Sequence, residues 1–285
     1  MQEVSVSVVI PAYNEEQHIA ACLEAIACQT VRPFEVIVVD NNSTDSTVAI
    51  AHRYPFVTIV HEPRQGVMYA RDAGFNAARG QVIGRIDGDS IVASDWIETI
   101  QTLFRDSSLD AASGAVHYRD VGLSQAFDTV DLKVRQYLST RMQQSGEFFL
   151  YGVNMAIRRS AWRAVRQQVC HERRFHEDQD LAIHMSQRNQ RIVFTPALKA
   201  SISPRQAASG PQQFLQYVWS NPHVYVAHGR PSARYMSRVA LFVSCLYIPI
   251  YFLYRGYNPA TGRCSVRYAL WNETTARVSP VSESV

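Results

Sequence analysis

Two carboxylates lie one residue apart at the end of an apolar run. Asp87-Gly88-Asp89 follows Val82–Ile86, whose composition predicts a buried strand. In an extended chain, residues two apart point to the same side, so the carboxylates of Asp87 and Asp89 face one region. Hard oxygen ligands of this kind suit Mg²⁺ or Mn²⁺ and, through the metal, a diphosphate. The competing interpretation is a solvated Asp-x-Asp turn without a ligand.

The elements that precede this pair alternate between strands and helices. Strands are predicted at Val4–Ile10, Phe34–Val39, Val57–Val60 and Val82–Ile86. Helices are predicted after Asn14 as an N-cap, over Thr47–Arg53, and over Gly66–Ala78 with Gly80 as a C-cap. This alternation indicates a parallel sheet with helices on both faces.

Polar residues gather at the strand ends of the predicted sheet. Tyr13, Asp40 and the Asp87/Asp89 pair each follow a different strand. Ligands of parallel sheets bind beyond the carboxyl ends of the strands, so these side chains are expected at one edge. A random scatter would place polar groups at both edges. Their convergence is the main argument from the residues for a binding site.

After Asp95 the alternation becomes weaker. Strands are predicted at Ala111–His117 and Tyr151–Arg159, and helices over Ser124–Met142, from Ser160 and from His176. Irregular chain is predicted around Pro196, Pro204 and Pro211.

Composition describes a globular protein with a substantial core, since 47% of its 285 residues are hydrophobic and 19% are charged. The five cysteines show no CxxC spacing, which indicates reduced thiols, and Cys22 and Cys28 are predicted to be small core residues. The chain begins with a predicted strand and no basic and apolar leader, so a cleaved signal peptide is not expected.

The C-terminal third is basic. No Asp or Glu occurs from Leu181 to Asn272, which favours an anionic neighbour such as a membrane surface. The arginines are dispersed, so a nucleic-acid partner is not expected. Val239–Tyr254 carries no charge but is shorter than the roughly 20 residues of a membrane span, and Pro249 interrupts it. An interfacial or re-entrant helix is predicted, with a core helix packed on the domain as the alternative.

Four motifs occur in order: Val8–Glu15, Val38–Asp45, Asp87–Asp89 and Glu177–Leu181. With this set the chain resembles the family 2 inverting glycosyltransferases over roughly residues 4–200. The resemblance implies an α/β fold of GT-A type, a Rossmann-like, mostly parallel sheet flanked by helices, with a nucleotide-sugar-binding half at 1–105 and an acceptor-binding and catalytic-base half of the same domain at 106–200. The charge distribution and the apolar window add a basic and apolar C-terminal appendage, a helical, membrane-associated region at 201–285.

The resemblance also implies donor-side roles. The nucleotide-sugar is expected to contact Pro11, Tyr13, Glu15, Asp40, Arg71, Asp87, Gly88 and Asp89. Tyr13 would lie against the base and Asp40 would accept a base N–H; their alternatives are a packed tyrosine and a helix cap. Arg71 would lie near the base or a phosphate, or would be a solvated helix arginine. Asp87 would contact the ribose or the metal, and Asp89 would ligate the Mg²⁺ or Mn²⁺.

The acceptor side of the family matches later residues. Asp178 corresponds to the general base that deprotonates the acceptor hydroxyl, with Glu177 as second choice. Their alternative role is simply to begin a helix. Gly152 and Asn154 match an acceptor-side segment.

The expected activity is the metal-dependent, inverting transfer of one sugar from a UDP-linked donor to a lipid-linked or cell-envelope glycan. A cytoplasmic enzyme, peripheral or monotopic at the inner face of the membrane, is expected. The Gln-x-x-Arg-Trp signature of processive synthases is absent, the nearest match being Gln216–Trp219. A nucleotidyltransferase would need a glycine-rich loop where Pro11–Glu15 stands. A non-catalytic membrane-docked binding protein is the other alternative, and the intact Asp87, Asp89 and Asp178 argue against it.

Overall fold

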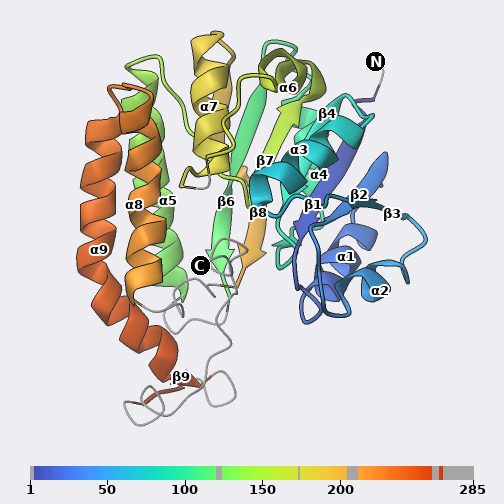
Figure 1. The fold of residues 1–285 in the computed structure, drawn as a ribbon, viewed down its shortest axis with the longest axis horizontal. Coiled ribbons are helices and arrows are strands. Elements are labelled where there is room, and N and C mark those ends of the chain that lie inside the picture. The colour runs from blue at the N-terminus through green and yellow to red at the C-terminus, as the bar shows by residue number, and fades with distance from the viewer. Residues whose placement is uncertain (1–2, 120–123, 173, 204–210, 259–262, 266–285) are drawn as a thin grey trace.

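The computed structural model describes residues 3–119, 124–172, 174–203, 211–258 and 263–265. Most of its strands form one eight-stranded sheet in the order β3-β2-β1-β4-β7-β6-β8-β5 (Figure 1). These strands are β1 (Val6–Ala12), β2 (Glu35–Asp40), β3 (Val57–His61), β4 (Val82–Ile86), β5 (Ile91–Val92), β6 (Ala111–Tyr118), β7 (Asn154–Arg158) and β8 (Ile192–Ile202). A separate antiparallel pair is formed by β9 (Tyr257–Asn258) and β10 (Arg263–Cys264).

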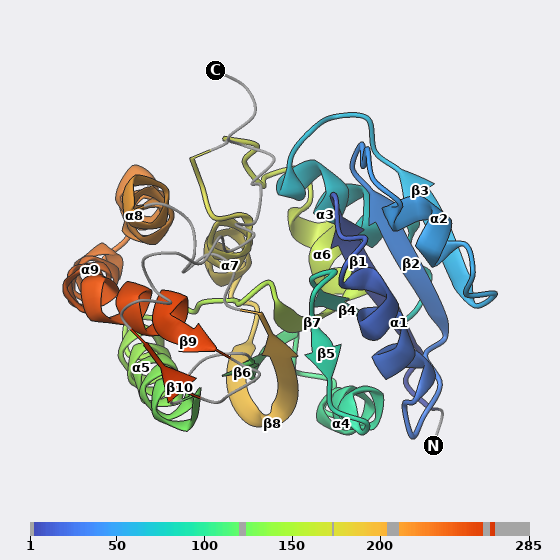
Figure 2. The same ribbon diagram turned by 90° about the horizontal axis from the view of Figure 1, so that it is seen from below.

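Helices flank the sheet, as the alternation predicted (Figure 2). They are α1 (Ile19–Ala27), α2 (Thr47–Ala51), α3 (Val67–Ala77), α4 (Trp96–Leu103), α5 (Ser124–Gln143), α6 (Arg159–Val165), α7 (Glu177–Gln187), α8 (Pro211–Ala227) and α9 (Ala233–Gly256). The predicted α/β architecture is therefore confirmed for the part of the chain described here.

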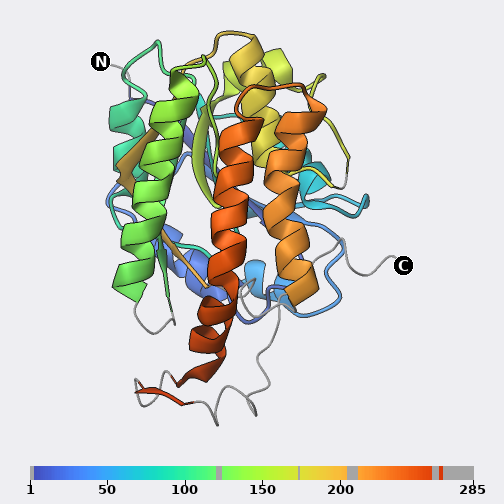
Figure 3. The ribbon, with the colours of Figure 1, turned by 90° about the vertical axis from the view of Figure 1, so that its left-hand side faces the viewer.

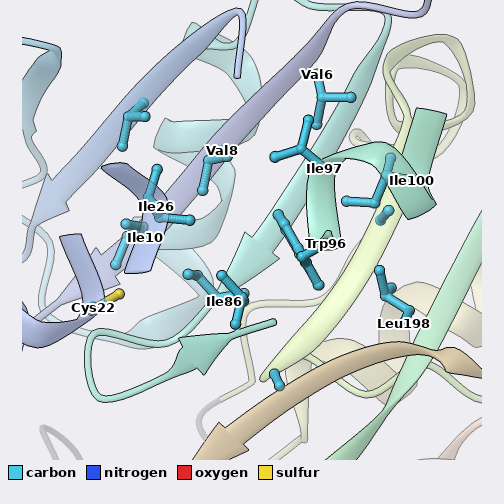
Figure 4. Packing of buried hydrophobic residues seen from close by; sticks show 14 of the residues in the cluster. Val6, Val8, Ile10, Cys22, Ile26, Ile86, Trp96, Ile97, Ile100 and Leu198 are labelled. Carbon is cyan, nitrogen blue, oxygen red and sulfur yellow. The ribbon is translucent and has the colours of Figure 1, made fainter. Parts of the chain in front are cut away.

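The sheet has an apolar core on each face. On one face, residues of α1 and α4 pack against β1 and β4, and Figure 4 shows Trp96 and Ile100 of α4 beside Val6 and Val8 of β1. On the other face, residues of α3, α6 and α7 pack against the same sheet. Burial on both faces explains why the central strands are almost continuously apolar.

Strand direction decides which loops meet. The four strands β1 to β4 pair in parallel, so their carboxyl ends share one edge. Strand β7 runs antiparallel to β4, and its first residue, Asn154, pairs with the last residue of β4, Ile86. The segment before β7 therefore lies beside Asp87–Asp89, although more than 60 residues separate them in the sequence.

Two predicted helix caps are wrong. Asn14 lies at φ 51° and its side-chain Oδ1 accepts the N–H of Thr44 at 2.8 Å, whereas α1 begins only at Ile19. Helix α3 ends at Ala77 because Ala78 turns extended, and the N–H of Gly80 donates to Ser7 Oγ. Both residues fasten loops to neighbouring segments and cap no helix.

The irregular chain predicted around the prolines is wrong in two places. Pro196 lies within β8 where its pairing with β6 shifts register between Gly114 and Ala115, so the strand bulges around the missing N–H. Pro211 is the first residue of α8, a position where a helix needs no N–H. Pro204 lies outside the described residues. Cys28 was expected in the core but is exposed just after α1.

The C-terminal region is a helical hairpin of α8 and α9 that lies beside α5 (Figure 3). Its apolar contacts include Phe214 and Val218 of α8 with Ala240 and Tyr247 of α9. The apolar window Val239–Tyr254 is part of α9. Among the described residues, none of the helices combines the length and the apolarity that a membrane span requires.

Candidate active site

The polar residues predicted at the strand ends share one edge of the sheet. Asp40 ends β2 and pairs in register with Ala12, the last residue of β1, so Tyr13 follows immediately beside it. Asp87 and Asp89 follow β4, the neighbour of β1 on the other side. Pro11 is buried in β1, beyond the point where pairing with β4 ends at Val9. These strand ends therefore lie at one edge of the sheet, as the alternation of strands and helices predicted.

The loop after β1 is fixed to the loop after β2. The N–H of Asn14 donates to Ser43 Oγ at 3.2 Å, and the N–H of Glu15 donates to Thr47 Oγ1 at 2.7 Å. Together with the Asn14–Thr44 bond, these contacts hold half-buried Tyr13 in one position. One wall of the edge is thus preorganised before any ligand binds.

Asp40 does not cap a helix. Its Oδ1 accepts the N–H of Ser43 at 3.0 Å, and its Oδ2 lies 3.1 Å from Nδ1 of His61 at the end of β3. Helix α2 begins at Thr47, whose N–H bonds to Asp45. The N-cap position of α2 is Ser46, so the alternative role of Asp40 as a helix cap is wrong, and Asp40 lies at the strand-end edge.

Three buried carboxylates gather around the Asp87–Asp89 turn. Glu15, Asp87 and Asp89 are only 2%, 7% and 4% exposed, so this is not a solvated turn. A Cβ on Gly88 would lie 3.0 Å from Glu15 Cγ, which shows how closely Glu15 packs on the turn. Burial, and then the charges of Asp89, Glu15 and Asp87, raise the pKa of the Cys22 thiol beneath them. The cluster concentrates negative charge, which favours a bound cation.

Arg85 links Asp87, in the Asp87–Asp89 turn, to Glu177, the residue before the predicted base Asp178. It is buried in β4 and precedes Asp87 by two residues, so both point to the same side. Its Nη2 lies 3.3 Å from Asp87 Oδ1 and its Nη1 lies 2.7 Å from Glu177 Oε1. Sequence reasoning missed Arg85, although an arginine within an apolar strand is itself a signal, because a buried cation needs carboxylate partners.

Gly152 provides the space for this bridge. A Cβ at this position would lie 2.3 Å from Arg85 Nη1, closer than any stable contact. The N–H of Gly152 also donates to Asp178 Oδ2 at 2.9 Å. A glycine here lets the guanidinium and the Asp178 carboxylate approach the same backbone segment.

Asn154 has a scaffold role in this structure. Its Oδ1 accepts the indole N–H of Trp96 at 2.8 Å, and its Nδ2 donates to the carbonyls of Ala115 and Leu198. The side chain is fully buried. Its amide therefore joins α4, β6 and β8, and is already occupied by these partners.

Glu177 and Asp178 begin α7 at the same edge. The guanidinium of Arg71 is completely buried, donates to the carbonyl of Glu177, and pairs with Asp72 at 2.7 Å. Arg71 is therefore not a solvated helix arginine; it fixes the start of α7 from the side of α3. The described hydrogen bonds of its guanidinium go to Asp72 and to the carbonyl of Glu177.

The two carboxylates of α7 differ in basicity. Burial and the neighbouring charge of Glu177 raise the pKa of Asp178. Burial acts in the same sense on Glu177, but Arg85 and His176 outweigh it and lower the pKa of that carboxyl. Glu177 thus stays ionised as the partner of Arg85, while Asp178 is the more basic group. In active sites, opposite pKa shifts of two neighbouring carboxyl groups commonly leave one as a charge partner and the other as a proton acceptor.

Aromatic residues that sequence reasoning missed surround Asp178. Tyr151 precedes Gly152, and Arg135 of α5 lies over its ring at 3.4 Å from the centroid. Tyr217 of α8 packs edge-on against His176, with ring centroids 4.6 Å apart. Burial of the hydroxyl, and then the charges of Tyr151, Asp178 and Glu177, raise the pKa of Tyr217. The C-terminal hairpin therefore contributes a side chain to the site.

Comparison with known proteins identifies the chain's family. The sequence profile described as glycosyl transferase family 2 matches residues 7–166, which is more than half of the chain. The chain belongs to glycosyl transferase family 2. The matched segment contains the strand-end residues, the Asp87–Asp89 turn and Gly152, and it ends before α7.

Members of this family align with only part of the chain. The chain is 34% identical over 110 residues to YibD, an uncharacterized glycosyltransferase of Escherichia coli K12, and 32% identical over 120 residues to glycosyltransferase AglE of Haloferax volcanii. These alignments cover 37% and 40% of this chain, and 32% and 40% of the two relatives. A chondroitin synthase of Escherichia coli is 33% identical over 104 residues, 35% of this chain and 15% of the relative. The chain thus matches well under half the length of each of these relatives.

Solved structures confirm the GT-A fold. A mannosyltransferase of Pyrobaculum calidifontis, solved with GDP-Man and Mn²⁺, superposes with a TM-score of 0.61 at 19% identity, covering 95% of this chain and 79% of the other. Staphylococcus aureus TarS, solved with UDP-GlcNAc, gives 0.55 at 17% identity, covering 78% and 66%. The predicted fold of GT-A type is therefore correct.

Proposed function

We propose that this family 2 glycosyltransferase is an inverting enzyme that moves one sugar from a nucleotide-sugar to an acceptor hydroxyl, with Asp178 as general base. The observation that carries the proposal is the bridge through Arg85, which joins Asp87 of the donor turn to Glu177, the neighbour of Asp178. The bridge places the Asp87–Asp89 turn, where the diphosphate of the donor would bind, on one side of the buried Arg85 guanidinium. The more basic carboxylate, Asp178, lies on the other side. An inverting displacement needs these two groups on opposite faces of the anomeric carbon.

The donor turn fits a divalent metal. Asp87 and Asp89 supply hard oxygen ligands beside Glu15, and Mg²⁺ and Mn²⁺ commonly use one or two carboxylates plus substrate phosphates. When bound, the metal would offset the charge that develops on the departing nucleoside diphosphate. His176, Glu177 and Asp178 also form a group of metal-ligand type, but Asp178 is the proposed base and Glu177 lies closer to Arg85 than Asp87 does, at 2.7 Å against 3.3 Å. We therefore assign the metal chiefly to Asp89, with Asp87 as the second ligand.

The chain's own residues would bind the rest of the donor. Tyr13 presents an aromatic face for the base, and the Asp40 carboxylate, fixed by Ser43 and His61, would accept a base N–H. Pro11, Glu15 and Gly88 would contact the donor at the same edge of the sheet. Arg71 acts indirectly in this account, since it positions α7. A UDP-linked donor is the proposal here; one solved neighbour binds UDP-GlcNAc and another GDP-Man.

The acceptor would bind on the side of Asp178. Tyr217, which is 37% exposed, offers an aromatic surface for a sugar ring, whereas Arg135 already covers one face of Tyr151. The backbone N–H of Gly152 fixes Asp178 Oδ2. The other carboxylate oxygen accepts the N–H of Gln179. Asp178 would take the proton of the acceptor hydroxyl as that oxygen attacks the anomeric carbon and the nucleoside diphosphate leaves.

A donor panel tests this function. In thermal-shift measurements with Mn²⁺ at one ligand concentration, we expect the UDP-sugars that bind more tightly to raise the melting temperature further, and the best donor to release UDP slowly with water as acceptor. The same panel with GDP-sugars decides the nucleotide. Release of pyrophosphate from a nucleoside triphosphate and a sugar phosphate would instead indicate a nucleotidyltransferase. Binding without release on any acceptor would indicate a binding protein.

The acceptor's location is suggested by one face of α9. Arg234, Arg238, Leu241 and Phe242 are exposed, and their spacing puts them on one side of the helix. Leu241 and Phe242 are 57% and 49% exposed. Basic residues followed by large apolar side chains are typical of helices that lie on an anionic membrane surface. We propose that this face docks the enzyme at a membrane carrying a lipid-linked or cell-envelope acceptor.

We expect the double variant Leu241→Ser/Phe242→Ser to bind vesicles of anionic phospholipid about tenfold or more weakly than the unaltered chain, because two apolar anchors are lost. Vesicle flotation measures the binding. Phe34→Ser is the matched control, since Phe34 is 56% exposed, lies just before β2 and is far from α9 in the sequence. Equal flotation of all three proteins, or no flotation of any, would refute membrane docking through α9.

A further inference from the structure

A second cluster of metal-ligand side chains lies outside the donor turn. It consists of Cys170, Asp180, His184 and His228. The donor atoms of all four lie within 4.8 Å of one another. Nothing in the proposed transfer reaction uses these residues, so their convergence needs a separate explanation.

The four residues come from three separate segments. Asp180 and His184 lie one turn apart on α7, which puts both on one face of the helix. Cys170 belongs to the loop before α7, and His228 follows directly after the last residue of α8. The cluster therefore lies where α7, the helix that begins with Glu177 and Asp178, meets the C-terminal hairpin of α8 and α9.

The distances approach those of a tetrahedral metal site. Asp180 Oδ1 lies 2.9 Å from Nε2 of His228 and 3.5 Å from Nε2 of His184. Cys170 Sγ lies 3.9 Å from both of these nitrogens. Metal–ligand bonds of about 2.0–2.3 Å in a tetrahedron separate the ligand atoms by roughly 3.3–3.6 Å. Small side-chain adjustments would bring all four atoms to one ion.

The surroundings of the cluster support a fixed internal site. Asp180 is fully buried, and its Oδ2 accepts the N–H of Cys170 at 2.8 Å, which leaves Oδ1 facing the imidazoles. His184 is also buried, and within the described residues its Nδ1 has no hydrogen-bond partner. Its ring is therefore held through Nε2, the atom that faces the cluster.

We propose that Cys170, Asp180, His184 and His228 bind a structural Zn²⁺ ion. One thiolate, two imidazole nitrogens and one carboxylate match the ligand preferences of zinc, and with all four positions filled by protein the site is structural in type. The set differs from the all-oxygen donor turn, which suits Mg²⁺ or Mn²⁺. The ion would fasten the end of α8 to α7, and so hold Tyr217 over the helix that carries Asp178.

Metal content of the full chain tests the proposal. We expect about one Zn²⁺ per chain by elemental analysis after purification without added metal, and Zn²⁺ to raise the melting temperature of chelator-treated protein. Cys170→Ser and His228→Ala should each weaken zinc binding by more than about 10–100-fold, because losing a direct ligand costs more than losing an outer partner. Co²⁺ substituted for Zn²⁺ should give a thiolate charge-transfer absorption that Cys170→Ser abolishes.

The controls keep the outcome independent of the transfer reaction. Cys28→Ser and His52→Ala alter exposed residues outside the cluster and should retain zinc and its thermal effect. Asp89→Asn alters the donor turn and should also retain zinc. Zinc absent from the unaltered chain with no response to added Zn²⁺, or zinc retained equally in Cys170→Ser and His228→Ala, would overturn the proposal. Donor turnover enters none of these readouts.

Discussion

We expect the variant Asp178→Asn to transfer sugar about 10²–10⁴-fold more slowly than the unaltered enzyme, the range that a positioned general base contributes. The amide cannot take the acceptor's proton, yet it occupies nearly the same volume and can still accept one of the two backbone hydrogen bonds, from Gly152 or Gln179. Initial rates of nucleoside diphosphate release in the presence of acceptor measure the loss. Melting temperature shows whether the variant remains folded.

The pH profile gives a second readout of the same residue. A base works ionised, so the rate should fall as pH drops through its pKa. Because burial and the charge of Glu177 raise the pKa of Asp178, the acid limb of kcat/KM should lie above the value of about 3.9 for an ordinary aspartate. Asp95→Asn is the matched control, since Asp95 is exposed and its side chain caps nothing. If Asp178→Asn showed the same transfer rate and the same acid limb of kcat/KM as Asp95→Asn, the assignment of Asp178 as general base would be contradicted.

The second large effect is expected for Asp89→Asn. Replacing the carboxylate that is proposed to ligate the metal should reduce transfer by on the order of 10²-fold or more, because the metal contributes several kcal/mol to the transition state. The apparent affinity for Mn²⁺ should fall as well. A titration of activity against Mn²⁺ at fixed donor concentration measures both.

The neighbouring carboxylates sharpen this test. Asp87 is paired with Arg85, so Asp87→Asn should also disturb the bridge to Glu177, whereas Asp89→Asn should leave that bridge intact. Excess Mn²⁺ should therefore restore the transfer rate of Asp89→Asn more fully than that of Asp87→Asn. An Mn²⁺ titration of Asp89→Asn that superimposes on that of the unaltered enzyme would show that the metal, or the diphosphate, is held elsewhere.

Local patterns in the sequence predicted the N-terminal part of the fold, up to β4, well. The strand ends at Tyr13, Asp40 and Asp87 could be placed at one edge because parallel strands, once recognised, align their carboxyl ends. The predicted strand Val82–Ile86 has the bounds of β4. Helix caps failed because Asn14 and Gly80 form hydrogen bonds with segments far away in the sequence, which no local pattern reveals.

The features that could not be predicted from the sequence depend on contacts between residues far apart in the chain. Arg85 was overlooked because its role depends on Glu177, which lies on a helix more than 90 residues later. Tyr217 reaches the site only because α8 packs on α7, and β8 could not be recognised because Pro196 interrupts its pattern at a bulge. The Cys170–His228 cluster likewise depends on how the hairpin packs, since its spacing matches no local metal motif.

The central claim is that the Asp87–Asp89 turn holds the donor while Asp178 acts on the acceptor. The most direct measurement compares donor affinity and single-turnover transfer in Asp178→Asn and Asp89→Asn, each at the one Mn²⁺ concentration that just saturates the unaltered enzyme. The account predicts that Asp178→Asn binds the donor within about twofold of the unaltered enzyme but transfers at least about 10²-fold more slowly, while Asp89→Asn loses both. Donor binding lost in Asp178→Asn, or transfer retained by it, would contradict the account.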